Sequence, residues 1–308
     1  MDFRSFKSLV LNCCLKMHKY NILKKLELIK PGILLGNLIS LSGGFFLASR
    51  GHIETILFLR VLLGITCIIS SACILNNIID RDLDKTMHRT KYRILCISNS
   101  NALVQSLFFL ALFLFILGLF IFYMYINVLS AIFSIIGIFF YVILYSLFLK
   151  RITSYSTIVG SVSGSLPPII GYIAVKNNLD LCCLILFFIF SFWQIAHAYS
   201  IILYRINDYT LINIPTVPIL HGIVYTKKCI SICIISLFFF NFLLFYFSYV
   251  NILYFFITSL FIFFWFCLSI FGHLFLFSEQ KWSRIMFLYS ILLIFLMSFL
   301  MSANYLKY

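Results

Sequence analysis

The sequence contains very few charged residues. Only 10% of its 308 residues are charged, whereas 63% are hydrophobic. A soluble domain of this size needs a more polar surface, so this composition excludes an ordinary soluble protein. The short alternating segments of a membrane β-barrel are also missing, and apolar runs of about twenty residues recur along the whole length instead. The composition therefore predicts an all-α, polytopic membrane protein.

The chain also lacks the cysteine spacing of a metal cluster. Its ten cysteines include no CxxC pair, and most of them fall inside apolar runs. A thiol in such a run acts as a small hydrophobic side chain. We therefore expect neither a disulfide framework nor a cysteine-based metal site.

We expect nine membrane helices. They lie near residues 31–49, 54–78, 101–122, 126–149, 155–175, 180–205, 227–248, 251–277 and 284–303. The fifth of them is expected to be interrupted by Pro167 and Pro168. Gly160, Gly164 and Gly171 around this pair favour a kink or close packing with a neighbouring helix.

Basic residues mark every second loop between these helices. The formal net charge is +14, and the Lys and Arg residues gather before the first helix and in alternate loops. The positive-inside rule then places the N-terminus in the cytoplasm and the C-terminus outside, which requires an odd number of helices. Because these cations anchor loops at an anionic membrane surface, we expect the lipid bilayer, and no nucleic acid, as their partner.

The N-terminal segment is predicted to stay on the mature protein. The first thirty residues carry seven Lys or Arg, but no short apolar core with a small-residue cleavage site. We expect a cytoplasmic segment at 1–30, followed by a single transmembrane domain at 31–308. No Arg- and Ser-rich transit segment precedes the first span, which favours a bacterial-type inner (cytoplasmic) membrane over an organelle.

Three of the nine acidic residues stand within five positions at the end of the second helix. Asp80 and Asp84 follow Asn76 at intervals of four, so on a helix the three side chains share one face. Like charges at that spacing repel, and the cost rises near the membrane. One amide and two carboxylates form a set of hard oxygen ligands that suits Mg²⁺, with a substrate phosphate supplying further ligands.

A salt-bridge network is the alternative explanation of the same run. Arg81, Lys85 and Arg89 lie close enough in sequence to neutralise the carboxylates in a solvated loop. Such a network explains Asp82 well, but it explains the stripe of one amide and two carboxylates less well. We therefore favour a metal and diphosphate site.

Two further polar groups stand out against the apolar runs. Lys150 and Arg151 end the fourth helix, either as snorkelling membrane anchors or as phosphate ligands. His197 precedes Asp208 by eleven residues, about three helical turns, so the two share a face. An intramembrane histidine serves either as a hydrogen bonder between helices or as part of a functional site.

The polar motifs resemble those of a known enzyme family. NNIIDRDLD at 76–84 resembles the first aspartate-rich motif of the UbiA-type intramembrane prenyltransferases. Similarity to the haem O synthase branch of that family extends over MHRTKYR (87–93), YSLFLKR (145–151), GSVSGSLPPIIGY (160–172), WQIAH (193–197) and IPTVP (214–218). The resemblance runs from about Lys30 to Gly222.

The chain departs from the family pattern at three places. Ile94 and Ala196 stand where many members of the branch have proline. The second Asp-x-x-x-Asp motif of many UbiA-type enzymes is reduced to Asp208, with Asn207 beside it. A second metal ion would therefore have fewer protein ligands, a feature that the haem branch shares.

The resemblance implies a UbiA-type bundle that transfers the farnesyl group of farnesyl diphosphate to a vinyl group of haem B. Water adds in the same reaction, giving haem O for respiratory terminal oxidases. The resemblance implies Mg²⁺ as cofactor, haem B as a substrate rather than a permanent cofactor, and downstream haem or oxidase-assembly proteins as further partners. Two alternatives stay open: a UbiA-type enzyme acting on an aromatic quinone precursor, and a cation-coupled transporter, whose charges belong nearer mid-membrane.

The resemblance also implies roles for individual residues. The metal ligands are Asn76, Asp80, Asp84 and Asp208. The diphosphate ligands are Arg89, Lys91, Arg93, Lys150 and Arg151. The acceptor-binding residues are Gln194, His197 and Tyr204. The catalytic residues are Asp80, Asp84, Asp208 and His197.

Overall fold

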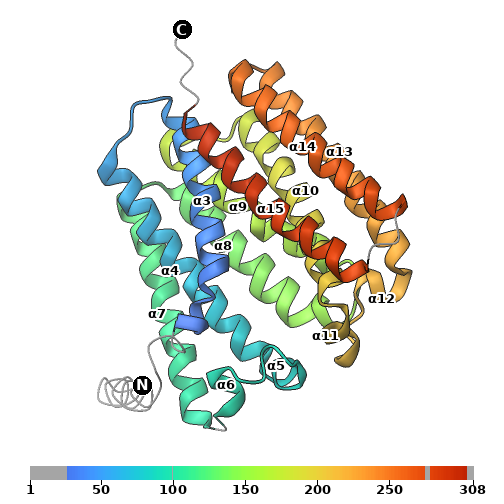
Figure 1. Ribbon diagram of the computed structural model, residues 1–308. Helices are drawn as coiled ribbons and strands as arrows, with labels where there is room; N and C mark the ends of the chain where they lie inside the picture. Colours follow the sequence, from blue (N-terminus) through green and yellow to red (C-terminus); the bar gives the residue numbers. More distant parts are fainter. Residues whose placement is uncertain (1–25, 99, 275–277, 304–308) are drawn as a thin grey trace.

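The computed structural model describes residues 26–98, 100–274 and 278–303, and its regular structure there is entirely helical (Figure 1). Nine helices in this part of the chain are long and apolar enough to cross a membrane. They are α3 (Pro31–Ser49), α4 (Thr55–Ile79), α7 (Asn101–Tyr125), the composite α8–η2–η3 (Val128–Arg151), α9 (Ser156–Lys176), α10 (Leu181–Tyr204), α13 (Ile223–Tyr246), α14 (Ile252–Leu274) and α15 (Glu279–Ser302). The predicted all-helical, nine-span architecture is confirmed. Most of the predicted N-terminal segment lies outside the described residues.

The helix boundaries follow the prediction to within a few residues, with two larger differences. The seventh and ninth spans begin four and five residues earlier than expected, at Ile223 and Glu279. In the ninth span, Lys281 was assigned to the preceding loop but lies inside α15. In the seventh span, Lys227 was expected at the first position of the helix but lies four residues inside α13, where it is buried and pairs with Glu279 at the start of α15.

The predicted interruption of the fifth helix is wrong. α9 runs unbroken with Pro167 and Pro168 inside it. Each proline removes a backbone hydrogen bond, but α9 gains close packing against α3. A Cβ on Gly44 of α3 would lie 1.9 Å from the Pro168 carbonyl oxygen, and one on Gly171 would lie 2.2 Å from the carbonyl oxygen of Leu41. The two backbones therefore touch, as small residues allow in membrane helices.

Four helices form the centre of the bundle. α3 and α10 each pack against both α9 and α15, so the four close a ring (Figure 1). α4, α7 and α8 cover one side of this group, and α13 and α14 cover the other. α9 and α10, which carry most of the polar motifs after the aspartate cluster, are the most buried spans.

The short helices lie together at one end of the bundle. α5 (Arg81–Thr86), α6 (Ile94–Ile97), α11 (Ile206–Leu211) and α12 (Val217–His221) are all found at the lower end of Figure 1, with η1 (Glu27–Ile29). We call this the α5 end. α15 finishes at the opposite end, so the first and last described segments lie on opposite faces, as an odd number of spans requires.

The fourth span changes its helical form before it reaches the α5 end. α8 (Val128–Ile138) continues as the π-helix η2 (Phe139–Phe148) and ends in the 3₁₀ turn η3 (Leu149–Arg151). Wider turns of this kind often occur at functional sites. Here the change brings Ser146 and Lys150 against the end of α4.

Candidate active site

The aspartate stripe is continuous across the break between α4 and α5. The backbone N–H of Asp80 donates to the Asn76 carbonyl over 2.8 Å, and that of Asp84 donates to the Asp80 carbonyl over 2.8 Å. These two bonds keep the three side chains one turn apart although α4 ends at Ile79. All three are buried, with 3%, 5% and 6% of their surface exposed. The stripe therefore faces the protein interior.

Asp82 points away from this stripe. Its carboxylate forms two hydrogen bonds of 2.7 Å with the guanidinium of Arg151, and its side chain is exposed. The hydrogen bond from Arg151 lowers the pKa of Asp82 below its usual value. Asp82 thus takes part in a solvated ion pair, while its two acidic neighbours belong to the buried site.

The buried carboxylates are neutralised by cations from other segments. Lys150 donates to Oδ2 of Asp80 over 2.6 Å, and Arg93 donates to Oδ2 of Asp84 over 2.5 Å. Arg81, which a local salt-bridge network would use, instead donates to the carbonyl oxygens of Leu95 and Ser98. Ion pairs from η3 to the end of α4, and from the α5–α6 loop to α5, therefore neutralise the cluster.

Lys30 is a further cation of this site that the sequence reasoning missed. Its Nζ donates to Oδ1 of Asn76, whose Nδ2 in turn donates to Oδ2 of Asp80 and to Oγ of Ser146, each over 2.9 Å. Burial lowers the pKa of Lys30 to about 8. A cation next to Oδ1 fixes the orientation of the amide, because an ammonium group accepts no hydrogen bond. Asn76 is therefore held with its NH₂ toward Asp80.

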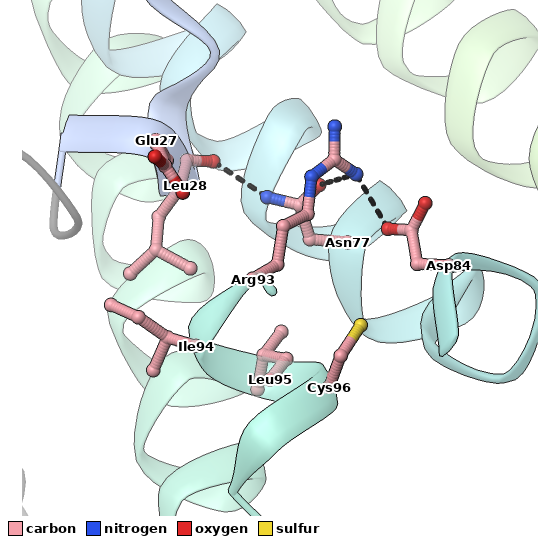
Figure 2. A pocket seen from close by; sticks show the side chains of 8 residues that line it. All are labelled: Glu27, Leu28, Asn77, Asp84, Arg93, Ile94, Leu95 and Cys96. Atoms are coloured by element: carbon pink, nitrogen blue, oxygen red, sulfur yellow. Dashed lines mark hydrogen bonds and ion pairs between the residues drawn. The ribbon is translucent and has the colours of Figure 1, made fainter. Parts of the chain in front are cut away.

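A small pocket beside Asp84 is lined by residues of η1, α4, α5, α6 and the loop before α6. Figure 2 shows Arg93 extending toward both Asp84 and Asn77. The Asn77 amide donates over 2.9 Å to the carbonyl oxygen of Leu28, in η1. This bond ties η1 to α4, and Lys30 follows two residues later, directly before α3 begins.

The donor set fits Mg²⁺ bound together with a diphosphate. Oδ1 of Asp80 is buried and lacks a hydrogen-bond partner within the described chain, a costly state unless a ligand completes it. In that same part of the protein, no three His, Cys, Asp or Glu side chains converge into a metal-binding group. Mg²⁺ is commonly held by only one or two carboxylates plus water and substrate phosphates. Asp80 and Asp84 can supply that minimum.

The segment after α10 faces the same cluster. Burial raises the pKa of Tyr209 in α11 to about 12, and Tyr145, Lys150, Arg89 and Asp80 all act on it electrostatically. Tyr209 is therefore within electrostatic reach of the carboxylate site, although the sequence reasoning did not select it. Asp208, its neighbour, is partly buried. The structure thus brings α11 to the site without joining Asp208 to Asp80 and Asp84 in one acidic group.

The other predicted cations lie around this cluster. Lys91 sits over the ring of the exposed Tyr92, 5.1 Å from its centroid. Arg89 is exposed and acts electrostatically on Tyr209. Together with Arg151 on Asp82, these residues form a basic rim at the α5 end.

The predicted acceptor residues lie at successive positions along α10. Nδ1 of His197 is 2.6 Å from Oγ of Ser290 in α15, so the histidine forms an interhelical hydrogen bond. Gln194 packs on α9, where a Cβ on Gly164 would lie 2.9 Å from its Cδ. Tyr204 lies nearest the α5 end, with Arg284 of α15 5.9 Å from its ring centroid.

Comparisons with known proteins agree with these features. The UbiA prenyltransferase family model matches residues 37–291. A protoheme IX farnesyltransferase of Buchnera aphidicola subsp. Cinara cedri is 60% identical over 277 residues, which cover 90% of this chain and 99% of the relative. A protoheme IX farnesyltransferase of Blochmanniella pennsylvanica is 41% identical over 283 residues, covering 92% and 96%.

Solved structures share the fold at low sequence identity. A digeranylgeranylglyceryl phosphate synthase superimposes with a TM-score of 0.71 and 15% identity, covering 91% of this chain and 97% of the other. A UbiA homologue from Archaeoglobus fulgidus, bound to DMAPP and Mg²⁺, gives a TM-score of 0.66 and 14% identity, covering 91% and 99%. The nine-span bundle is therefore that of these proteins.

Proposed function

This chain belongs to the UbiA prenyltransferase family, and we propose that it is a protohaem IX farnesyltransferase that converts haem B into haem O. The observation that carries this function is the 60% identity to a protoheme IX farnesyltransferase over nearly the full length of both chains. The reaction joins the farnesyl group of farnesyl diphosphate to a vinyl group of haem B and adds water to the product.

The carboxylate stripe is the proposed site for the metal and the diphosphate. Asp80 and Asp84 would hold Mg²⁺, with Asn76 beside them and Asp208 on the facing segment. The buried Oδ1 of Asp80, which has no hydrogen-bond partner among the described residues, supports this role. When bound, Mg²⁺ supplies positive charge to the diphosphate oxygens.

The cations paired with the stripe have a second task when substrate binds. Lys150 and Arg93 neutralise Asp80 and Asp84 in the structure described here. A bound diphosphate brings its own negative charge to the same place, and these side chains then donate to its oxygens. Arg89, Lys91 and Arg151 extend the same positive field to the rim. Groups fixed in place before the reaction stabilise the charge that develops on the leaving group.

The proposed reaction breaks and forms bonds in three successive steps. The carbon–oxygen bond of farnesyl diphosphate breaks, and its electron pair leaves with the diphosphate. The π electrons of a haem vinyl group then form a carbon–carbon bond to the allylic cation. Water adds to the resulting cation on the porphyrin side chain and releases a proton. Gln194, His197 and Tyr204 are proposed to orient the acceptor, while the surrounding apolar helices keep water away from the allylic cation.

The proposed location is a bacterial inner membrane with the α5 end in the cytoplasm. The positive-inside rule supports this orientation, because the basic rim and Lys150 lie at that end. Farnesyl diphosphate, with its water-soluble headgroup, would then reach the carboxylates from the cytoplasmic side. Proteins that process haem O or assemble terminal oxidases are the proposed downstream partners.

One assay tests the proposed function. Purified protein is supplied with Mg²⁺, farnesyl diphosphate and haem B, and the products are separated by chromatography. We expect haem O, and no product when the metal is chelated. Prenylation of a hydroxybenzoate but not of haem would contradict the choice of acceptor. Failure to release diphosphate with any acceptor would contradict the enzyme activity itself.

A further inference from the structure

Ser290 of α15 makes two contacts with α10. Its Oγ lies 2.6 Å from Nδ1 of His197, and its backbone carbonyl accepts a 2.9 Å hydrogen bond from Nε1 of Trp193. Ser290 is fully buried. The rings of Trp193 and His197 are stacked, with centroids 4.8 Å apart and planes inclined by 18°. One residue of the last helix thus holds two neighbouring rings of α10.

These contacts determine which nitrogen of His197 carries the proton. Oγ of Ser290 also lies 2.6 Å from the carbonyl oxygen of Phe287. A carbonyl oxygen only accepts, so the single hydroxyl proton of Ser290 is directed to Phe287. Oγ must then accept from His197, which places a hydrogen on Nδ1. The neutral imidazole therefore keeps a free lone pair on Nε2.

The free nitrogen belongs to a ring that lies against those of Trp193 and Phe287, with centroids 4.8 Å and 5.2 Å away. His197 is partly exposed, whereas Ala196 and Ser200 on the same helix are fully buried. Nδ1 is taken by Ser290, and the structure gives Nε2 no hydrogen-bond partner within residues 26–98, 100–274 and 278–303. The lone pair is therefore available to a bound molecule, either as a base or as a ligand for a metal ion.

Depth along α10 favours a ligand over a base. His197 precedes Tyr204 by seven residues, which places it roughly 10 Å further from the α5 end. A base must lie within a hydrogen bond, or one water molecule, of the proton it removes. The reacting vinyl carbon has to approach the farnesyl carbon beside the carboxylates, at the α5 end. In a haem, the iron lies at the ring centre and the vinyl groups at the edge, so a deeper ligand can hold the iron while a vinyl group reaches toward the diphosphate.

We propose that Nε2 of His197 is the axial ligand of the haem iron in the acceptor complex, and that Ser290 is the positioning residue that fixes this tautomer. The proposal rests on the proposed function, since it takes haem B as the acceptor. The proposal assigns α15 a functional role that the sequence did not indicate. A hydrogen bond to the other ring nitrogen is how proteins usually orient a histidine that binds a metal.

Electron paramagnetic resonance of the ferrous haem–nitric oxide complex tests the ligand. We expect the full-length protein, loaded with haem B, to show hyperfine splitting from a nitrogen trans to the nitric oxide. His197→Ala should lose this splitting, and added imidazole should restore it. An unchanged spectrum in His197→Ala, or a wild-type spectrum without the trans nitrogen, would overturn the proposal.

Two serine variants test the positioning role. Ser290→Ala keeps the backbone bond to Trp193 and removes only the hydroxyl, so we expect haem affinity to fall about tenfold with a weakened trans-nitrogen signal. Ser290→Thr retains the hydroxyl and should restore both. Ser298→Ala is the matched control, because Ser298 is buried in the same helix and its Oγ lacks a partner in the described part of the chain. Equal haem affinity and equal spectra for Ser290→Ala and wild type would overturn the positioning role.

The outcome is separable from that of the proposed function. Haem O formation by a protein without the trans-nitrogen signal would leave the proposed function standing and remove the axial ligand. A trans-nitrogen signal in a protein that makes no haem O would support the axial ligand and contradict the proposed function. Farnesyl diphosphate binding in the presence of Mg²⁺, measured on every variant, shows that the fold is intact.

Discussion

Lys150 donates a hydrogen bond to Oδ2 of Asp80 over 2.6 Å, while Oδ1 of the same carboxylate is buried without a hydrogen-bond partner in the described chain. The two oxygens are therefore in different states: one is neutralised by a protein cation, and the other is left for a ligand. This asymmetry is what a site for a metal-bound diphosphate requires, because the carboxylate must be ordered before the substrate arrives.

Removal of Lys150 should impair catalysis more than folding. In Lys150→Met, Asp80 loses its cation and the leaving diphosphate loses a donor, so we expect kcat/KM to fall about 100-fold. Haem O formation at varied farnesyl diphosphate concentrations measures this loss. Lys228→Met is the matched control, since Lys228 is an exposed lysine near the same end of the bundle. A similar loss in both variants would show that the effect is not specific to the Asp80 pair.

Lys30 should act mainly on substrate binding. It contacts Asn76, and through it Asp80. We expect Lys30→Met to raise the KM for farnesyl diphosphate about tenfold, because the amide is no longer held toward the carboxylate and a positive charge is lost. Lys176→Met, at the opposite end of the bundle, should leave KM unchanged. A fall in kcat with KM unchanged would contradict the assigned role.

The contact between α3 and α9 should be sensitive to a single methyl group. A Cβ on Gly44 would lie 1.9 Å from the Pro168 carbonyl oxygen, whereas one on Gly36 would meet no atom within 4 Å. We therefore expect Gly44→Ala to destabilise the protein by about 1–3 kcal/mol through overpacking. Thermal unfolding in detergent compares Gly44→Ala with Gly36→Ala. Equal melting temperatures would mean that the two backbones are not in contact.

The buried Lys227 should be needed for stability rather than for chemistry. Its Nζ donates to Glu279 over 2.9 Å and to the Gly272 carbonyl over 2.7 Å, and it lies 4.9 Å from the ring centroid of Trp282. Lys227→Met leaves Glu279 and this carbonyl without their donor, so we expect a lower melting temperature with KM unchanged. The double variant with Glu279→Gln should recover part of the loss. A melting temperature equal to that of wild type would exclude this ion pair as a stabilising contact.

The sequence predicts the bundle because a chain inside a membrane must satisfy its own backbone hydrogen bonds, which favours helices. Apolar runs of about twenty residues then mark where these helices cross. The aspartate stripe was found for a related reason, since three carboxylates are conspicuous in a chain with nine acidic residues. Lys150 was accessible to the same reasoning, because it closes an apolar run. These features depend on local composition and spacing, which a sequence displays directly.

Contacts made across the fold were not accessible in this way. Lys30 resembles any lysine that anchors the start of a span, and its contact with Asn76 depends on η1 being tied to α4 through Asn77. Ser290 is one serine among many in apolar helices, and its importance follows only from its position beside His197. The burial of Lys227 was not predicted, because its partner Glu279 is fifty-two residues away. In each case the role of the residue depends on its partner in the folded protein, and the residue type alone does not indicate that partner.

Binding of Mn²⁺ in the presence of farnesyl diphosphate tests the central assignment most directly. The metal is followed by electron paramagnetic resonance in wild type, Asp80→Asn and Asp82→Asn. Asp82 is the internal control, because it lies in the same segment but pairs with Arg151 at the surface. We predict that Asp82→Asn binds the metal and the diphosphate as wild type does, while Asp80→Asn loses the joint binding. Wild-type binding by Asp80→Asn would contradict the assignment of the stripe as the metal and diphosphate site.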